Sequence, residues 1–400
     1  MASPAPAAPT HIIRAHKSPV SALHISSDNS LIYSGDSSGW VFVTSTRSLR
    51  TIASWQAHSD AILGLEETLK TLITHGRDNK LHAWPRPREL PASAQVGGSA
   101  VAGAAAHDSI QSNENDRRAV TSMDVNALNY CRFSLLRSPD HAGDLIALPN
   151  LVDSSCADIW LFPACDRLHA AIGKPKDAPT IPLDGRGNEK TGIIMSLHLF
   201  RSARESSFSS ELRLLCAYEN GGVTLRRCTR PFGEKTVEGK GWEVIWTSKV
   251  HVESIMAMSV TRNSSVALTV SADHLVGRYD LNAVTADTAS TVHRTKHPGN
   301  GCVAIRDDGR VCAIGGWDGS IRLYSTKSLK PLGTLRYHKT ACQALAFAHA
   351  SAGADERHSG DAADSDEEDV APPDLERWLI AGGKDTRLSI WSLQSFERAQ

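Results

Sequence analysis

The sequence predicts an all-β fold in which seven four-stranded blades close into a single ring. Two observations carry this prediction. A block of about eleven residues recurs along the 400-residue chain, and neighbouring copies lie 40 residues (Ser38 to Asp78) or 45 residues (Asp273 to Asp318) apart. A histidine precedes most of the copies. A period of about 40–45 residues with four strands per unit is typical of WD40 β-propellers.

Each copy of the block has a short apolar strand, small residues, a tight turn with Asp or Gly, and alternating apolar residues that end in an aromatic residue. Tight turns and a period of two predict strands rather than helices. The clearest copies are residues 314–324, 381–391, 74–84 and 269–279.

Three weaker copies complete the count of seven. Residues 34–44 place Ser38 at the position of the turn aspartate, and residues 218–226 place Asn220 there. The segment 130–160 keeps a strand at 145–148 and a final Asp158-Ile159-Trp160, but it has no clear turn.

These units predict one propeller domain over residues 10–395. The strand at 10–14 is expected to complete the last blade, because ring closure removes exposed sheet edges. The predicted blades are approximately 15–55, 56–90, 123–170, 190–245, 246–292, 293–336 and 337–392 plus 10–14.

The histidines and turn aspartates indicate structural hydrogen-bond networks. The second unit offers His58, Thr74, Asp78 and Trp84, the four residue types of a WD-repeat tetrad. A buried carboxylate is costly unless its oxygens are hydrogen-bonded, so we expect structural rather than catalytic roles. The same reasoning assigns structural roles at other blade turns to Asp273, Asp318, Asp385, His251, His297 and His338.

Three segments depart from the repeat and are predicted to be disordered. They are the N-terminus (1–9), an Ala/Gly/Ser-rich insertion between the second and third blades (85–122), and an acidic insertion in the last blade (351–374). Ser365 directly precedes a run of acidic residues, Asp366 to Asp369, which makes it a candidate phosphosite. The alternative for this stretch is a solvated loop that maintains solubility.

The composition excludes several classes of partner. With 43 basic and 44 acidic residues the net charge is −1, so direct nucleic-acid binding is not expected. No apolar stretch approaches the roughly 20 residues of a membrane span, and the N-terminus does not resemble a signal peptide. The eight scattered cysteines indicate reduced thiols in the cytosol or nucleus.

No catalytic motif is recognisable, and we expect neither enzyme activity nor a cofactor nor a metal. The stretch 185–191 resembles a phosphate loop, but Glu189 stands where such a loop needs glycine. The residues near the rim of the central channel are therefore the candidate partner-binding site: Arg77, Trp317, Lys384 and Trp40. Trp317 alternatively packs against the neighbouring blade.

Two strings are more specific than a generic repeat, namely Thr-His-Gly-Arg-Asp-Asn-Lys at 74–80 and Gly-Gly-Trp-Asp-Gly at 315–319. With them the chain, from about 11 to 392, resembles the fungal ASTRA-associated protein 1 family. That family is similar to the animal G-protein β-subunit-like protein 1. The insertions at 85–122 and 351–374 depart from the family pattern.

The resemblance implies a non-catalytic scaffold subunit of an ASTRA-like complex. The implied partners are a large kinase-related scaffold protein, TELO2/TTI-type cochaperones and a pair of AAA-plus ATPases. The implied roles are chromatin remodelling and the assembly or stabilisation of phosphatidylinositol-3-kinase-related proteins, in the nucleus with the cytoplasm as a second location.

Two other functions compete with this one. A signalling adaptor that resembles a G-protein β-subunit would need a long N-terminal helix, whereas the first predicted strand here begins by about residue 11. A propeller enzyme would need carboxylates or histidines that converge on the channel, whereas those visible in the sequence are expected at blade turns.

Overall fold

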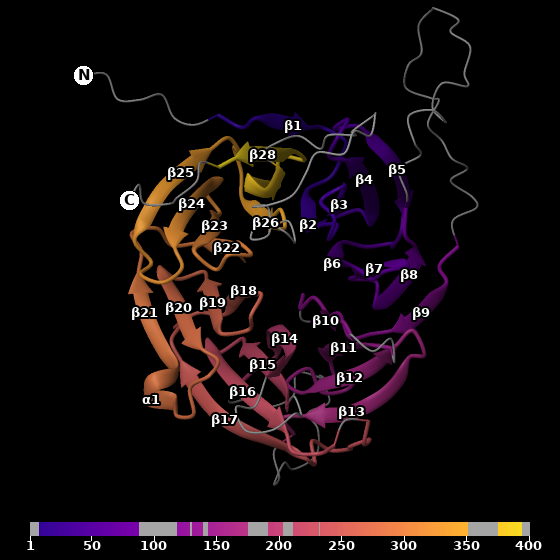
Figure 1. The fold of residues 1–400 in the computed structure, drawn as a ribbon, viewed down its shortest axis with the longest axis vertical. Helices are drawn as coiled ribbons and strands as arrows, with labels where there is room; N and C mark the ends of the chain where they lie inside the picture. The colour runs from indigo at the N-terminus through magenta and orange to yellow at the C-terminus, as the bar shows by residue number, and fades with distance from the viewer. Residues whose placement is uncertain are drawn as a thin grey trace, which may run out of the picture.

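Seven antiparallel four-stranded sheets surround a central axis in the computed structural model, like the blades of a propeller (Figure 1). The structure describes residues 8–87, 118–128, 130–138, 143–174, 191–202, 211–231, 233–350 and 375–393. The only helical elements among them are α1 (Ala286–Ala289) and the 3₁₀ helix η2 (Leu375–Arg377). The predicted all-β, seven-bladed fold is confirmed.

The blades are numbered here in chain order, and each is written from its innermost to its outermost strand. Blade 1 contains β2 (Val20–Ile25), β3 (Leu31–Asp36), β4 (Trp40–Ser45) and β5 (Thr51–Gln56). Blade 2 contains β6 (Ile62–Glu67), β7 (Thr71–Gly76), β8 (Lys80–Pro85) and β9 (Thr121–Asp124). Blade 3 contains β10 (Ser134–Leu136), β11 (Asp144–Pro149), β12 (Ala157–Phe162) and β13 (Asp166–Ile172).

Blade 4 contains β14 (Ile194–Ser202), β15 (Glu211–Tyr218), β16 (Gly222–Cys228) and β17 (Trp242–Lys249). Blade 5 contains β18 (Ile255–Val260), β19 (Val266–Ser271), β20 (Leu275–Asp280) and β21 (Ser290–Arg294). Blade 6 contains β22 (Asn300–Ile305), β23 (Val311–Gly316), β24 (Ser320–Ser325) and β25 (Pro331–Arg336). Blade 7 contains β26 (Cys342–Phe347), β27 (Trp378–Gly383), β28 (Leu388–Ser392) and β1 (His11–Ile13).

Blade 7 closes the ring with strands from both ends of the chain. The N-terminal β1 lies beside β28 in Figure 1 and pairs with it from His11↔Ile390 to Ile13↔Leu388. Ile13 is buried in the cluster between blades 7 and 1. The predicted N-terminal closure is therefore confirmed, and β1 covers an edge that β28 would otherwise expose.

The predicted position of the first insertion needs correction. Strand β9 pairs with β8 through Lys80↔Asp124, Leu81↔Met123, His82↔Ser122 and Ala83↔Thr121, so it is the outer strand of blade 2. The insertion therefore interrupts blade 2 and does not separate the second blade from the third. Residues 121–124, Thr-Ser-Met-Asp, are too short and too polar to be recognised as a strand from sequence. The segments 1–7, 88–117 and 351–374 of the three predicted disordered regions lie outside the described residues.

The second strand of each blade carries much of the core. All six residues of β3, β23 and β27 are buried, whereas five of the six residues of the outer strand β25 are exposed. A strand covered on both faces must be apolar or small throughout. The sequences Val-Cys-Ala-Ile-Gly-Gly and Trp-Leu-Ile-Ala-Gly-Gly meet this requirement.

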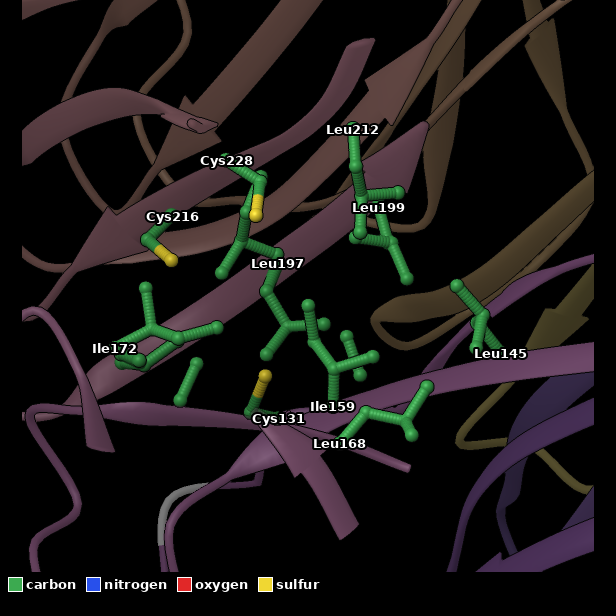
Figure 2. Close-up of a cluster of buried hydrophobic side chains, with 14 of the residues drawn as sticks. Cys131, Leu145, Ile159, Leu168, Ile172, Leu197, Leu199, Leu212, Cys216 and Cys228 are labelled. Atoms are coloured by element: carbon green, nitrogen blue, oxygen red, sulfur yellow. The ribbon is translucent and has the colours of Figure 1, made fainter. Parts of the chain in front are cut away.

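The apolar core consists of seven separate clusters, each lying between two neighbouring blades. Figure 2 shows the cluster between blades 3 and 4, where Ile159 lies near Leu197 and the thiol of Cys131, and Ile172 lies on the side of Cys216. Burying one leucine-sized side chain contributes about 1.5–3 kcal/mol. Because every cluster needs side chains from two blades, no blade buries its apolar surface alone.

In five of the seven blades the turn after the second strand contains a residue with positive φ. In blade 6 this residue is Gly319, with φ of 78°, and a Cβ there would lie 2.3 Å from the carbonyl oxygen of His338. Only glycine tolerates so close an approach. In blade 2 the same position is Asn79, with φ of 62°, a residue type that adopts the left-handed conformation comparatively easily.

Candidate protein-interaction site

Blade 2 contains the complete predicted tetrad. His58 Nδ1 lies 2.8 Å from Asp78 Oδ1, and His58 Nε2 lies 2.8 Å from Thr74 Oγ1. Trp84 Nε1 donates to the same Thr74 oxygen at 2.9 Å. Because Thr74 accepts from Trp84, its hydroxyl is free to donate to Nε2, which makes Nδ1 the protonated nitrogen that donates to Asp78.

The electrostatics of this network match a neutral histidine beside a carboxylate. Burial lowers the pKa of His58, against the attraction of Asp78. Burial alone would raise the pKa of Asp78, but hydrogen bonds from the backbone N–H of Ser59 and from His58 outweigh it and leave that pKa lowered. The tetrad therefore holds its groups in fixed protonation states and serves to tie the turn to the strands.

Blades 5 and 7 repeat the arrangement with small changes. His251 lies 3.1 Å from Asp273 and 2.8 Å from the hydroxyl of Thr269. His338 lies 2.9 Å from Asp385 and 2.9 Å from the hydroxyl of Ser389, which also accepts from Trp391. In blade 7 the hydroxyl thus comes from the third strand rather than from the second.

Blade 1 requires a correction, because Asp36 and not Ser38 is the turn carboxylate. His16 Nδ1 lies 3.0 Å from Asp36 Oδ2, and His16 Nε2 lies 2.8 Å from Ser34 Oγ. Asp36 also accepts from the backbone N–H groups of Ser38 and Trp40. Asp36 occupies the register of Gly76 in blade 2, two residues earlier than the usual aspartate, since Val20↔Asp36 corresponds to Ile62↔Gly76.

Blade 6 requires a second correction, because His297 is exposed and does not contact Asp318. The four bonded histidines each stand four residues before the first residue of their inner strand, as His58 does before Ile62. His297 stands only three residues before Asn300 and so misses that position. Asp318 instead binds Arg322, whose guanidinium donates to both carboxylate oxygens.

A cavity of about 960 Å³ occupies the central channel. It is lined mainly by the inner strands, which stand around the middle of Figure 1. Trp317 and Lys384, two of the four predicted rim residues, both line this cavity. Trp317 is 49% exposed, and its ring lies against the backbone of Gly299 and Gly301. It is therefore presented to solvent at the cavity mouth.

The other two predicted rim residues are placed differently. Arg77 is exposed and sits over the ring of Tyr130, 4.5 Å from its centroid, so it reaches the cavity only through that tyrosine. Trp40 is half-buried, lies 6.2 Å from the ring of Phe42 between centroids, and does not line the cavity. The structure thus brings together Trp317 and Lys384, with Arg77 at the edge.

Sequence reasoning missed several residues of the cavity mouth: Lys339, Arg132, Tyr130, Met195 and Met256. A signal for Lys339 was available, since it directly follows the blade histidine His338. No repeat position marks Tyr130 or Arg132, because the segment that precedes blade 3 has no recognisable repeat. Met195 and Met256 are the second residues of the inner strands β14 and β18.

The charged side chains of the described lining are all basic. Arg132, Lys339 and Lys384 line the cavity, and no aspartate, glutamate or histidine is among its described lining residues. Within the described residues there is also no group of three or more His, Cys, Asp or Glu side chains placed to hold a metal ion. The same part of the chain contains no helix long and apolar enough to cross a membrane. Ser365, the candidate phosphosite, lies outside the described residues.

Comparison with known proteins agrees with this architecture. The family model "WD domain, G-beta repeat" matches residues 7–44 and 291–325. The chain is 32% identical to ASTRA-associated protein 1 of Aspergillus flavus, an alignment that covers 97% of this chain and 98% of the relative. It is 30% identical to ASTRA-associated protein 1 of Verticillium alfalfae, over 96% of this chain and 92% of the relative.

A more distant relative is guanine nucleotide-binding protein subunit beta-like protein 1 of Mus musculus, with 23% identity over 98% of this chain and 97% of the relative. The fungal similarities extend over essentially the whole propeller and exceed what a shared repeat requires. The chain belongs to the ASTRA-associated protein 1 family of WD-repeat proteins.

Proposed function

We propose that this chain is a non-catalytic scaffold subunit of an ASTRA-type assembly. The observation that carries the proposal is the 32% identity to the Aspergillus flavus ASTRA-associated protein 1 over 97% of the chain. An alignment of that extent includes every blade, so the surfaces between the insertions are comparable as well as the core.

The geometry supports a role in binding rather than in catalysis. General acid–base and nucleophilic chemistry needs titratable groups that converge on one concave site. The described lining of the central cavity supplies two lysines, an arginine and the buried thiols of Cys302 and Cys342, without a carboxylate or an imidazole. The buried His–Asp pairs of blades 1, 2, 5 and 7 are occupied in tying turns to strands.

We propose further that the partners are a large kinase-related scaffold protein, TELO2/TTI-type cochaperones and a pair of AAA-plus ATPases. In this proposal the assembly contributes to chromatin remodelling and to the maturation of phosphatidylinositol-3-kinase-related proteins. Its location is then the nucleus, with the cytoplasm as a second location. Family membership supports these assignments, and a rigid ring offers several faces to different partners at once.

A G-protein-like adaptor is the competing function, favoured by the full-length similarity to the mouse beta-like protein 1. A tagged full-length chain, isolated from its own organism at low salt and analysed by mass spectrometry, separates the two. Recovery of the kinase-related scaffold, its cochaperones and the ATPases together supports the ASTRA proposal. Recovery of a G-protein α-subunit without those components overturns it.

A further inference from the structure

Positive charge collects on one side of the cavity mouth, where the neighbouring carboxylate of Asp385 is mostly buried and is bonded to His338 and to the backbone N–H of Lys339. Lys339 and Lys384 project from two adjacent turns of blade 7, and both side chains are exposed. The backbone N–H of Lys384 donates to the carbonyl of Ala341 at 2.9 Å, which fixes the two turns relative to each other. Neither lysine forms a salt bridge with a described residue. Two ammonium groups that lack a salt-bridge partner among the described residues, placed at a concave mouth, attract a negatively charged ligand.

Beside the lysines, Trp317 provides a rigid aromatic surface. A Cβ at Gly299 would lie 2.9 Å from its ring, and a Cβ at Gly301 would lie 3.2 Å from its Nε1, so the indole rests on two glycine backbones. No described residue accepts a hydrogen bond from Nε1. An exposed tryptophan that is already held in place loses little entropy on binding, which is typical of an interface anchor.

The remainder of the mouth is apolar and adaptable. Met195, Met256 and Tyr130 line it, and Met256 and Tyr130 are 40% and 56% exposed. Methionine side chains adjust to the shape of an incoming apolar group. Deeper in the channel, Val303 and Leu345 continue the apolar wall.

We propose that this mouth binds an acidic, extended segment of a partner protein, which inserts one aromatic or aliphatic side chain beside Trp317 while its carboxylates pair with Lys339 and Lys384. The proposal rests on the proposed function as a protein scaffold and specifies the chemistry of one partner. A protein segment is favoured over nucleic acid because the lining contains only three cations among methionines and aliphatic residues, whereas nucleic-acid sites depend on many phosphate contacts.

The test uses the purified full-length chain and a phage-displayed library of random 12-residue peptides. We expect the selected peptides to be rich in Asp and Glu around one aromatic or aliphatic residue. A fluorescein-labelled selected peptide should then bind the chain with an affinity that falls as salt is raised. Selection of peptides without acidic enrichment overturns the proposal.

Variants place the peptide on the molecule. Lys339→Glu/Lys384→Glu should weaken binding of the labelled peptide at least tenfold, and Trp317→Ala should do so by a similar factor. The matched control is Lys327→Glu/Lys330→Glu, which changes the net charge equally but lies in the exposed turn at the far end of β24. It should leave the affinity within twofold. Equal affinity for all three variants overturns the proposal.

Two further measurements exclude other occupants. If a labelled 12-nucleotide single-stranded DNA binds as tightly as the peptide, and Lys339→Glu/Lys384→Glu but not Trp317→Ala abolishes its binding, the site is a nucleic-acid site and the proposal is wrong. If the chain dimerises in analytical ultracentrifugation and the lysine variant alone is monomeric, the occupant is a second copy, which also overturns it. Because these assays need no ASTRA component, peptide binding at the mouth can succeed even where the native pull-down fails.

Discussion

In blade 2 the turn carboxylate of Asp78 is held by a buried histidine, and in blade 6 that of Asp318 is held by an arginine. His58 comes from the loop between blades 1 and 2, and it links Asp78 in the turn to Thr74 on β7. Arg322 lies four residues from Asp318, on the strand that follows the same turn. Asp78 is mostly covered, with 14% of its side chain exposed, whereas 53% of the Asp318 side chain is exposed.

Blade 6 has the most recognisable turn sequence in the chain, Gly-Gly-Trp-Asp-Gly, yet its network is the more local and the more solvated of the two. A strong local motif therefore guarantees the turn but not the long-range hydrogen bonds. An exposed ion pair contributes at most about 1 kcal/mol, whereas breaking a buried network leaves unpaired polar groups at about 1–3 kcal/mol each. The two blades should consequently respond very differently to substitution.

The largest effect is expected from His58→Ala in blade 2. The substitution removes the two hydrogen bonds of the buried imidazole and leaves a cavity between Asp78 and Thr74, which keep their bonds from Ser59 and Trp84. The free energy of unfolding should fall by about 3 kcal/mol, measured by urea denaturation followed by circular dichroism. A loss below about 1 kcal/mol contradicts the assigned role of the tetrad.

Blade 1 sharpens the comparison, since its carboxylate stands at an unusual position. Asp36→Ala should lower the free energy of unfolding by about 2 kcal/mol, because Asp36 binds His16 and two backbone N–H groups. Ser38→Ala is the matched control at the position expected from the repeat, and it should change stability by less than about 0.5 kcal/mol. The reverse order would restore Ser38 as the turn residue.

Acid should destabilise blade 2 through His75, whose ring is fully buried and whose two nitrogens have no hydrogen-bond partner among the described residues. Burial lowers the pKa of His75 from 6.5 to about 3. Below about pH 6.5 this histidine is protonated in the unfolded chain, whereas in the folded chain it stays neutral down to about pH 3. The free energy of unfolding therefore decreases as the pH is lowered from 6.5 to 3.

His75→Leu should remove about 2 kcal/mol of the stability lost by the wild type between pH 7 and pH 5, measured by urea denaturation at each pH. Equal slopes for His75→Leu and the wild type would show that His75 titrates normally in the fold.

A smaller effect is expected from Arg322→Met in blade 6. The substitution keeps the packing volume but removes the partner of Asp318, and water solvates the half-exposed carboxylate. The free energy of unfolding should fall by about 1 kcal/mol. A loss as large as that of His58→Ala would mean that the two blades do not differ as their exposure indicates.

The smallest effect is expected from His297→Ala at neutral pH. His297 is exposed, and its backbone rather than its ring makes the hydrogen bonds recorded for it. The free energy of unfolding, measured by urea denaturation, should therefore change by no more than about 0.5 kcal/mol. A decrease in the free energy of unfolding of more than about 1 kcal/mol would show that His297 does have a structural role.

Much of the architecture was predictable, and so was part of the candidate site. The four residues of the blade 2 tetrad could be predicted from their spacing within the repeat. Trp317 and Lys384 could be predicted as rim residues because each directly precedes a turn aspartate. Lys339 was accessible by the same reasoning from His338. Three features could not be predicted from the sequence: the role of Asp36, the one-residue offset of His297 and the outer strand β9. Each of them depends on the register of a strand against its partner.

By itself, the sequence determined that the chain forms strands, that they group into seven blades, and that the first strand closes the last blade. These properties follow from the period of the apolar residues and from turn chemistry, which act over a few residues. Only the tertiary structure decided which carboxylate each histidine meets, and that Lys339, Lys384, Arg132 and Trp317 share one cavity whose described lining contains no acidic side chain. The reason is that these residues come from blades 3, 6 and 7, and only ring closure brings them to a common centre.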